Sequence, residues 1–147
     1  GRVAGRNIGG KPLTFDGVVG AQSFRLFSLE CAACGLSERE AAAAGFSPVS
    51  NITWGSAMAP ALGKKTLGLK LTADRSSGRL LGAQAVGQSG AVGRINALSV
   101  ALSAGMDLDE IGWLDLAYAP PFGAAWDIVH NAAQSLKRSI LSEGNLL

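Results

Sequence analysis

The spacing of apolar residues predicts strands in the first two thirds of the chain. Leu67, Leu69 and Leu71 stand at every second position and alternate with a glycine, a lysine and a threonine. A period of two is typical of a strand with one covered face and one wetter face. Turn residues at 74–78 are expected to join this strand to the next as a hairpin. Strands are predicted at residues 17–28, 29–34, 48–54, 66–73 and 79–87.

Helix signals lie between these strands and after them. Ser37 and Glu40 have the spacing of a capping box, which predicts a short helix that ends at Gly45. Apolar residues at helical spacing predict a helix over 91–104, followed by an acidic helical turn that opens at 107–110. Residues 2–7 resemble the end of a helix that Gly9 and Gly10 stop.

The final helix is predicted over residues 124–140. Its apolar stripe consists of Ala125, Ile128, Val129, Ala132, Leu136 and Ile140, and its polar side of His130, Gln134, Lys137 and Arg138. Strands and helices are largely segregated along the chain, which is the pattern of an α+β layer arrangement. We therefore predict an antiparallel sheet of four to five strands with helices packed on one side.

Composition limits the function classes. The 147 residues suit one domain, and 48% are apolar while 16% are charged, which indicates a folded chain with a large covered surface. The net charge of +2 comes without a basic stripe, so we expect no nucleic-acid partner. No apolar run approaches the roughly 18 residues of a membrane span, and no signal-peptide pattern is present. We expect no membrane partner and a cytoplasmic location.

Three possible reactive centres have weak support. Cys31 and Cys34 form a C-x-x-C, but the predicted helix starts only at Ser37, so two small buried hydrophobic residues are favoured over a redox dithiol. His130, the single histidine, is expected to be a solvated surface residue on the polar side of the last helix. One histidine and two cysteines do not make a structural zinc site, and we predict no metal.

The glycine-rich segment at 87–93 follows a strand and opens a helix. Its glycine spacing is not that of the dinucleotide fingerprint, and the flanking sheet is predicted to be antiparallel. Tight packing of strand against helix is the favoured interpretation, ahead of nucleotide binding.

The loop at 114–122 is the strongest functional candidate. It carries Tyr118, the only tyrosine, directly before Ala119, Pro120 and Pro121. Proline fixes φ and favours extended geometry at the preceding residue, so this loop is stiff. The residues alone leave two interpretations open: Tyr118 packs its ring in the core while its hydroxyl bonds a carbonyl, or the loop presents it for function.

Several segments carry a resemblance to a known family. They are residues 1–8, 35–38, 45–46, 78–84, 90–95, 104–106 and 114–122, together with Trp126 and Asp127. In this order they resemble the C-terminal dimerisation domain of FAD-dependent pyridine nucleotide-disulfide oxidoreductases, over essentially the whole chain. The closest similarity is to the branch of coenzyme A-disulfide reductases and NADH oxidases.

The resemblance implies a homodimer in which each domain completes the active site of the other subunit. Tyr118 would act in trans near the partner's flavin and reactive cysteine, as a hydrogen-bond donor first and an acid second. The neighbours that would lie near the partner's flavin are Ala117, Ala119, Pro120, Pro121 and Phe122. FAD and NAD(P)H are expected in the full-length parent, which would act on a disulfide, a persulfide or oxygen, and none bound to this chain alone.

The resemblance also implies a division of the chain. Residues 1–10 would be the tail of the preceding FAD-binding region and a linker, and residues 11–147 the dimerisation domain, so that the sequence is expected to be a fragment without activity of its own. The helices at 91–104 and 124–140 and the exposed sheet face are candidates for the dimer interface. Two rivals remain: a stand-alone dimeric interaction module without redox activity, and a small dithiol redox protein.

One segment departs from the family pattern. Where coenzyme A-disulfide reductases have a stretch like Tyr-Tyr-Pro-Gly, this chain has residues 58–63, with Met58, Ala59 and Pro60. A second active-site tyrosine is therefore missing, and the sequence leaves the electron acceptor open.

Overall fold

Five strands form one antiparallel sheet in the computed structural model, which describes residues 1–144. The order across the sheet is β1-β2-β5-β4-β3, and the α+β fold predicted from the sequence is confirmed. β1 is shorter than the predicted 17–28, because only the residues that pair with β2 are extended as a ladder. The strands are β1 (Gln22–Leu26), β2 (Leu29–Gly35), β3 (Pro48–Ser56), β4 (Thr66–Asp74) and β5 (Leu80–Gly87).

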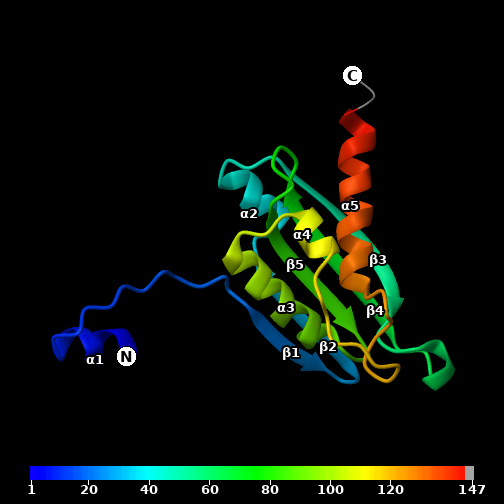
Figure 1. Cartoon of the computed structure of the whole chain (residues 1–147), viewed down its shortest axis with the longest axis horizontal. Helices are drawn as coiled ribbons and strands as arrows, with labels where there is room; N and C mark the ends of the chain where they lie inside the picture. The colour runs from blue at the N-terminus through cyan, green and yellow to red at the C-terminus, as the bar shows by residue number, and fades with distance from the viewer. Residues whose placement is uncertain (145–147) are drawn as a thin grey trace.

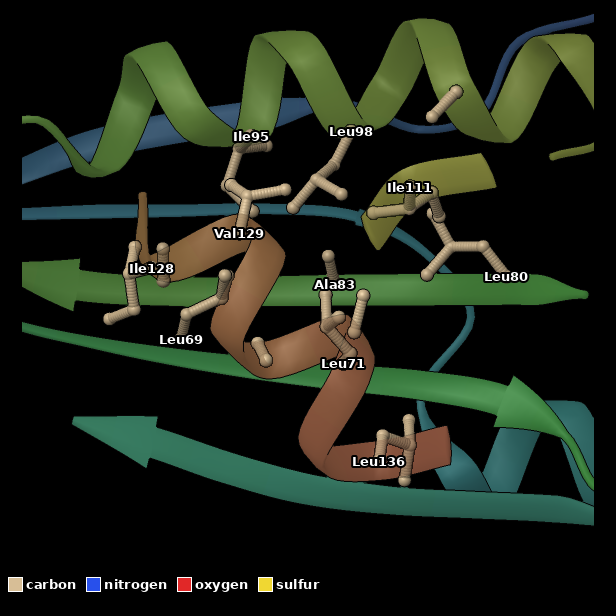
Figure 2. Close-up of a cluster of buried hydrophobic side chains, with 14 of the residues drawn as sticks. Leu69, Leu71, Leu80, Ala83, Ile95, Leu98, Ile111, Ile128, Val129 and Leu136 are labelled. Carbon is tan, nitrogen blue, oxygen red and sulfur yellow. The ribbon is translucent and has the colours of Figure 1, made fainter. Parts of the chain in front are cut away.

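Three helices cover one face of this sheet (Figure 1). They are α3 (Ala91–Ala104), α4 (Leu108–Gly112) and α5 (Ile128–Gly144). The leucines of β4, Leu67, Leu69 and Leu71, point into the core that these helices close, and all three are fully buried. Figure 2 shows Ile95 and Leu98 of α3 approaching this layer, with Val129 and Leu136 of α5. The predicted period of two on β4 thus has the expected covered face.

The remaining helices lie outside this layer. α2 (Glu38–Ala43) begins at the predicted capping box of Ser37 and Glu40. α1 (Arg2–Ile8) buries no residue and lies away from the sheet, at the end of an extended stretch (Figure 1). A short 3-10 helix, η1 (Pro60–Leu62), shapes the segment between β3 and β4 that the sequence left undefined.

The opposite side of the sheet carries exposed apolar side chains, and we call it the open face. One row of paired residues crosses all five strands, and a second row runs beside it. The prediction of a wetter face is only partly right, because Lys70 is half-buried and pairs with Glu38 of α2 at 2.6 Å. The open face consists of Phe24, Cys31, Val86, Gly68 and Trp54 in the first row and of Gln22, Ala33, Gln84, Lys70 and Ile52 in the second.

On the open face, the ring of Trp54 from the edge strand β3 lies over Gly68 of the neighbouring strand β4. A Cβ added to Gly68 would stand 2.8 Å from the Trp54 ring, so the ring fits here because residue 68 has no side chain. Trp54 is nevertheless 64% exposed, and Phe24 at the other edge of the sheet is 65% exposed. Large aromatic side chains with this exposure on one face mark an interaction surface.

The last helix begins later than predicted. α5 starts at Ile128 rather than at residue 124, and Ala125, assigned to its apolar stripe, is exposed ahead of the helix. The Asp127 carboxylate accepts a hydrogen bond from the backbone N–H of Val129 at 3.1 Å, which makes Asp127 the N-cap. An aspartate at this position favours a helix start over helix continuation, and this cap explains the shift.

Candidate functional site

The loop at 114–122 lies on the surface between α4 and α5. Tyr118 is 55% exposed, and the structure records no hydrogen bond from its hydroxyl to the described part of the chain. Phe122 is 75% exposed. The interpretation of Tyr118 as a core residue whose hydroxyl bonds a carbonyl is therefore wrong. The structure brings Ala117, Ala119, Pro120 and Pro121 together with these two rings on one short surface segment.

His130 fixes the entry to this loop. It is 5% exposed, so the prediction of a solvated surface histidine is wrong. The late start of α5 places His130 in the first helical turn, where its Nδ1 accepts a hydrogen bond from the backbone N–H of Asp127 at 3.0 Å. Its Nε2 lies 2.8 Å from the carbonyl oxygen of Leu114, to which it donates. The ring therefore ties the start of the loop to the start of α5.

Two tryptophans enclose the His130 ring from outside. Trp126 lies with its ring centroid 4.9 Å from that of His130, and Trp113 meets Trp126 edge-on at 5.6 Å. Edge-to-face aromatic packing at this separation adds to the burial of the ring. Both ring nitrogens of His130 are thus satisfied by backbone groups, which is typical of a structural histidine.

The middle of the loop is held by its own turn and by the segment before β4. Ala119 accepts hydrogen bonds at its carbonyl from the N–H groups of Phe122 at 2.9 Å and Gly123 at 3.2 Å. Pro120 accepts at its carbonyl from the N–H of Ala59 at 2.9 Å. The segment that departs from the family pattern therefore lies directly against the loop that carries Tyr118.

Arg94 fixes the exit from the loop. Its Nη2 donates to the carbonyl of Phe122 at 3.2 Å and to Oδ2 of Asp127 at 2.6 Å. Both side chains of this ion pair are 10% exposed. In the sequence, Arg94 and Asp127 stand within segments that carry the family resemblance, and no role was predicted for either of them.

The glycine-rich segment at 87–93 is tightly packed, but at Gly87 the close approach is to the neighbouring strand β4 and not, as predicted, to a helix. A Cβ on Gly87 would lie 2.7 Å from the carbonyl oxygen of Thr66. Gly90 adopts φ +76° as the N-cap of α3, and a Cβ there would stand 2.1 Å from Nη1 of Arg94. The N–H of Ala91 donates to a carboxylate oxygen of Glu30 at 3.0 Å. An acidic side chain therefore already occupies the helix N-terminus where a phosphate would bind.

The two cysteines point to opposite faces of the sheet. Cys34 is buried in the core, and this burial raises the pKa of its thiol. Cys31 is half-buried and lies in the first row of the open face. Three residues of strand separate their Cα atoms by about 10 Å, beyond the reach of a disulfide. The structure therefore contradicts a redox dithiol.

The described residues offer no complete cofactor pocket beside the loop. A hollow of about 200 Å³ lies between α3 and the loop, smaller than pockets that enclose drug-sized ligands. Residues 1–144 contain no cluster of three or more histidine, cysteine, aspartate or glutamate side chains that could hold a metal. None of the helices in this range has the length and apolarity required to cross a bilayer.

Comparisons with known proteins agree with the fold. Residues 21–129 match the family model described as the pyridine nucleotide-disulphide oxidoreductase dimerisation domain. The NAD(P)H sulfur oxidoreductase (CoA-dependent) of Pyrococcus furiosus is 36% identical over 93% of this chain, which spans 31% of that relative. Coenzyme A disulfide reductase of Staphylococcus aureus is 30% identical over 87% of this chain, which covers 29% of that enzyme.

A solved structure gives the same result. The NAD-dependent persulfide reductase from A. fulgidus superposes with a TM-score of 0.92 at 35% identity, over 96% of this chain and 26% of that one. The chain therefore spans about a third of the length of the relatives that it matches, 31% of the first. The resemblance to the coenzyme A-disulfide reductase branch is confirmed.

Proposed function

Because the chain belongs to the family of pyridine nucleotide-disulphide oxidoreductase dimerisation domains, we propose that it assembles as a homodimer and completes the active site of the partner subunit with Tyr118. The observation that carries the proposal is an exposed tyrosine on a loop whose backbone is fixed at its entry, middle and exit. A loop backbone fixed in this way presents Tyr118, whose hydroxyl has no hydrogen-bond partner among the described residues, to a group outside its own chain.

The parent protein in this proposal is a longer flavoprotein. FAD and NAD(P)H bind in regions outside residues 11–147, and residues 1–10 form the tail of the FAD-binding region and a linker. The flavin carries the electrons, and this domain supplies assembly and one wall of the site. One feature supports this division: α1 buries no residue and lies apart from the sheet (Figure 1).

Tyr118 acts by hydrogen bonding in this proposal. A neutral phenol donates its O–H to a thiolate or to a substrate oxygen, and this stabilises the anion next to the flavin. Proton transfer to the substrate is the secondary role. The apolar neighbours Ala117, Pro121 and Phe122 exclude water from the donor when the partner covers them.

The acceptor in this proposal is a small sulfur compound, with a disulfide or persulfide ahead of oxygen. The relatives are a CoA-dependent sulfur oxidoreductase, a coenzyme A disulfide reductase and a persulfide reductase by name. In this chain Ala59, not a tyrosine, donates to the loop at Pro120. One phenol rather than two then faces the substrate, which favours a smaller or less demanding acceptor than coenzyme A disulfide.

Self-association follows from the family, and we assign the interface to the open face and to the outer surfaces of α3 and α5. The open face offers Phe24, Ile52 and Trp54, each at least 60% exposed. Obligate homodimers of this kind bury about 2,000 Å² or more in total. These apolar side chains would form the centre of such an interface.

The test of the proposal is Tyr118→Phe in the full-length flavoprotein, which removes one hydroxyl and keeps the ring. We expect turnover to fall about tenfold or more, and the pKa of the reactive thiol to rise because its anion loses a donor. The control is Thr14→Val, which removes an exposed hydroxyl from the extended stretch before β1. Unchanged turnover together with an unchanged thiol pKa would reduce Tyr118 to a packing residue and favour the interaction module without redox activity.

A further inference from the structure

Arg94 occupies a position that helix electrostatics disfavours. It lies in the first turn of α3, where the helix dipole is positive and no acidic residue of the turn compensates. Glu30, from β2, reaches this end, and its carboxylate accepts a hydrogen bond from the N–H of Ala91. A cation placed against the helix dipole indicates that its own contacts outweigh this cost.

Those contacts converge on the exit of the Tyr118 loop. Nε of Arg94 donates to Oδ1 of Asp127 at 3.3 Å and Nη2 to Oδ2 at 2.6 Å, which is the bidentate geometry of a guanidinium and a carboxylate. Nη2 also donates to the carbonyl of Phe122 at 3.2 Å, and Nη1 to the carbonyl of Gly90 at 3.3 Å. One side chain thus joins the start of α3, the start of α5 and the end of the loop.

Two glycines leave the space that this arrangement needs. A Cβ on Gly90 would collide with Nη1 of Arg94 at 2.1 Å. A Cβ on Gly123, which directly follows the loop, would stand 3.3 Å from Nη2 of Arg94 and 3.3 Å from Oδ2 of Asp127. The backbone therefore closes around the ion pair on both sides, and the guanidinium has little freedom to move.

We propose that Arg94, paired with Asp127, is a positioning residue that sets the place of Tyr118 for the reaction. It acts through the carbonyl of Phe122 and through the N-cap of α5, and it touches neither substrate nor cofactor. The catalytic part of this inference rests on the proposed function of Tyr118. His130 holds the other end of the loop at the Leu114 carbonyl. Tyr118 therefore lies between two positions at which the loop backbone is fixed.

Lysine cannot replace this arginine. Its single ammonium nitrogen lacks the planar fork that bonds both oxygens of Asp127 and the Phe122 carbonyl at the same time. Arg94→Lys keeps the positive charge that neutralises the buried Asp127 carboxylate, but it loses the set of hydrogen bonds that fixes the exit of the loop. The variant separates the geometry of Arg94 from its charge.

The direct test uses the single tyrosine as a probe. Fluorotyrosine incorporated into the 147-residue chain gives one fluorine resonance, that of Tyr118. In Arg94→Lys we expect this resonance to split or move toward the position of the unfolded chain while the far-UV spectrum of the protein is retained. The matched control is Arg39→Lys on the exposed side of α2, which should leave the resonance unchanged. An unchanged resonance in Arg94→Lys overturns the proposal.

The second test asks whether Arg94 acts through Tyr118 in the full-length flavoprotein. We expect Arg94→Lys to lower kcat about tenfold, and no further loss when it is added to Tyr118→Phe, because both changes remove one effect. Losses that multiply in the double variant would make Arg94 independent of Tyr118 and overturn the proposal. If Tyr118→Phe alone leaves turnover unchanged, the proposed function fails, and the fluorine result still decides whether Arg94 holds the loop.

Discussion

The two faces of the sheet are made by the same five strands and have opposite surroundings. On β4, Leu67, Leu69 and Leu71 are fully buried beneath α3 and α5. On the neighbouring β3, Ile52 and Trp54 point the other way and are 60% and 64% exposed. Both faces are apolar at their centres, so apolar content alone does not distinguish the inner face from the outer one.

The difference lies in what covers each face. The covered face meets helices of its own chain, and its burial stabilises the folded monomer. The open face has only α2 at one end, through the pair of Lys70 with Glu38. Apolar surface that the chain leaves exposed is available to a second copy, which is the role that we propose for it. The covered face should therefore control folding, and the open face association.

The largest expected effect comes from truncating the covered face. Leu69→Ala should lower the free energy of unfolding by about 3 to 4 kcal/mol, because it removes a fully buried side chain and leaves a cavity. Ile52→Ala, on the open face, should lower it by less than about 1 kcal/mol in the monomer. Urea unfolding at submicromolar concentration measures both. Equal losses would break the distinction between the two faces.

Substitutions on the open face should change the dissociation constant of the dimer. Trp54→Ser should weaken the dimer by about 2 kcal/mol, or roughly 30-fold in dissociation constant, because it removes the largest apolar side chain of that face. Sedimentation equilibrium of the 147-residue chain measures the change. Ile8→Ser, which alters an 89% exposed apolar residue on α1, is the control and should leave the dissociation constant unchanged. Identical association of wild type and Trp54→Ser would place the interface elsewhere.

A smaller effect on the free energy of unfolding should come from Asp74, at the hairpin end of β4, which belongs to neither face. Hydrogen bonds from Ser76 and Ser77 lower the pKa of Asp74 from 3.8 to about 2. Since the folded-state pKa is below the unfolded one, Asp74 stabilises the fold above pH 3.8, and this contribution is lost as the pH falls toward 2.

Comparison of unfolding free energies at pH 6 and pH 2.5 tests this contribution. The loss on acidification attributable to Asp74 should be on the order of 1 kcal/mol, and Asp74→Asn should remove that part of the pH dependence. If the variant shows the same acid loss as the wild type, the stabilisation comes from other carboxylates.

The reactivity of the two cysteine thiols reports how exposed each face of the sheet is, and this measurement should disturb the fold least. A thiol reagent should modify Cys31 in the native chain and Cys34 only after unfolding, because burial raises the pKa of Cys34 and shields it. Single variants Cys31→Ser and Cys34→Ser assign the two signals by mass. Modification of Cys31 should slow as the protein concentration rises and the open face becomes covered. Rapid native modification of Cys34 would contradict the assignment of faces.

Most of the fold could be predicted from local patterns. The alternation on β4, the capping box at Ser37 and the acidic helical turn that opens at 107–110 act over a few residues and are visible in the sequence. The length of β1 could not be read in this way, because only its partner β2 determines where the edge strand ends. The start of α5 was missed because the stripe extends without a break past Asp127, whose capping role outweighs it.

The candidate site was less predictable than the fold. Tyr118 could be identified as a candidate from the sequence because it is the only tyrosine and is followed, after Ala119, by two prolines. The long-range contacts that hold its loop join residues 16 to 61 positions apart, and no local pattern encodes them. One signal was present for Arg94, a cation in the first turn of a helix. The assignment of Tyr118 and its neighbours to a partner's active site stays a prediction, as do the domain boundary at residue 10 and the cytoplasmic location.

The anchors of the Tyr118 loop have a consequence for how such a site can change over evolution. Leu114, Pro120 and Phe122 are all held by their backbone carbonyls. Every residue type carries such a carbonyl, so the side chains at the tip can be exchanged without loosening the frame. A lineage could therefore substitute Tyr118 at little cost in folding stability, and under the role proposed above for this residue such a change would alter the acceptor.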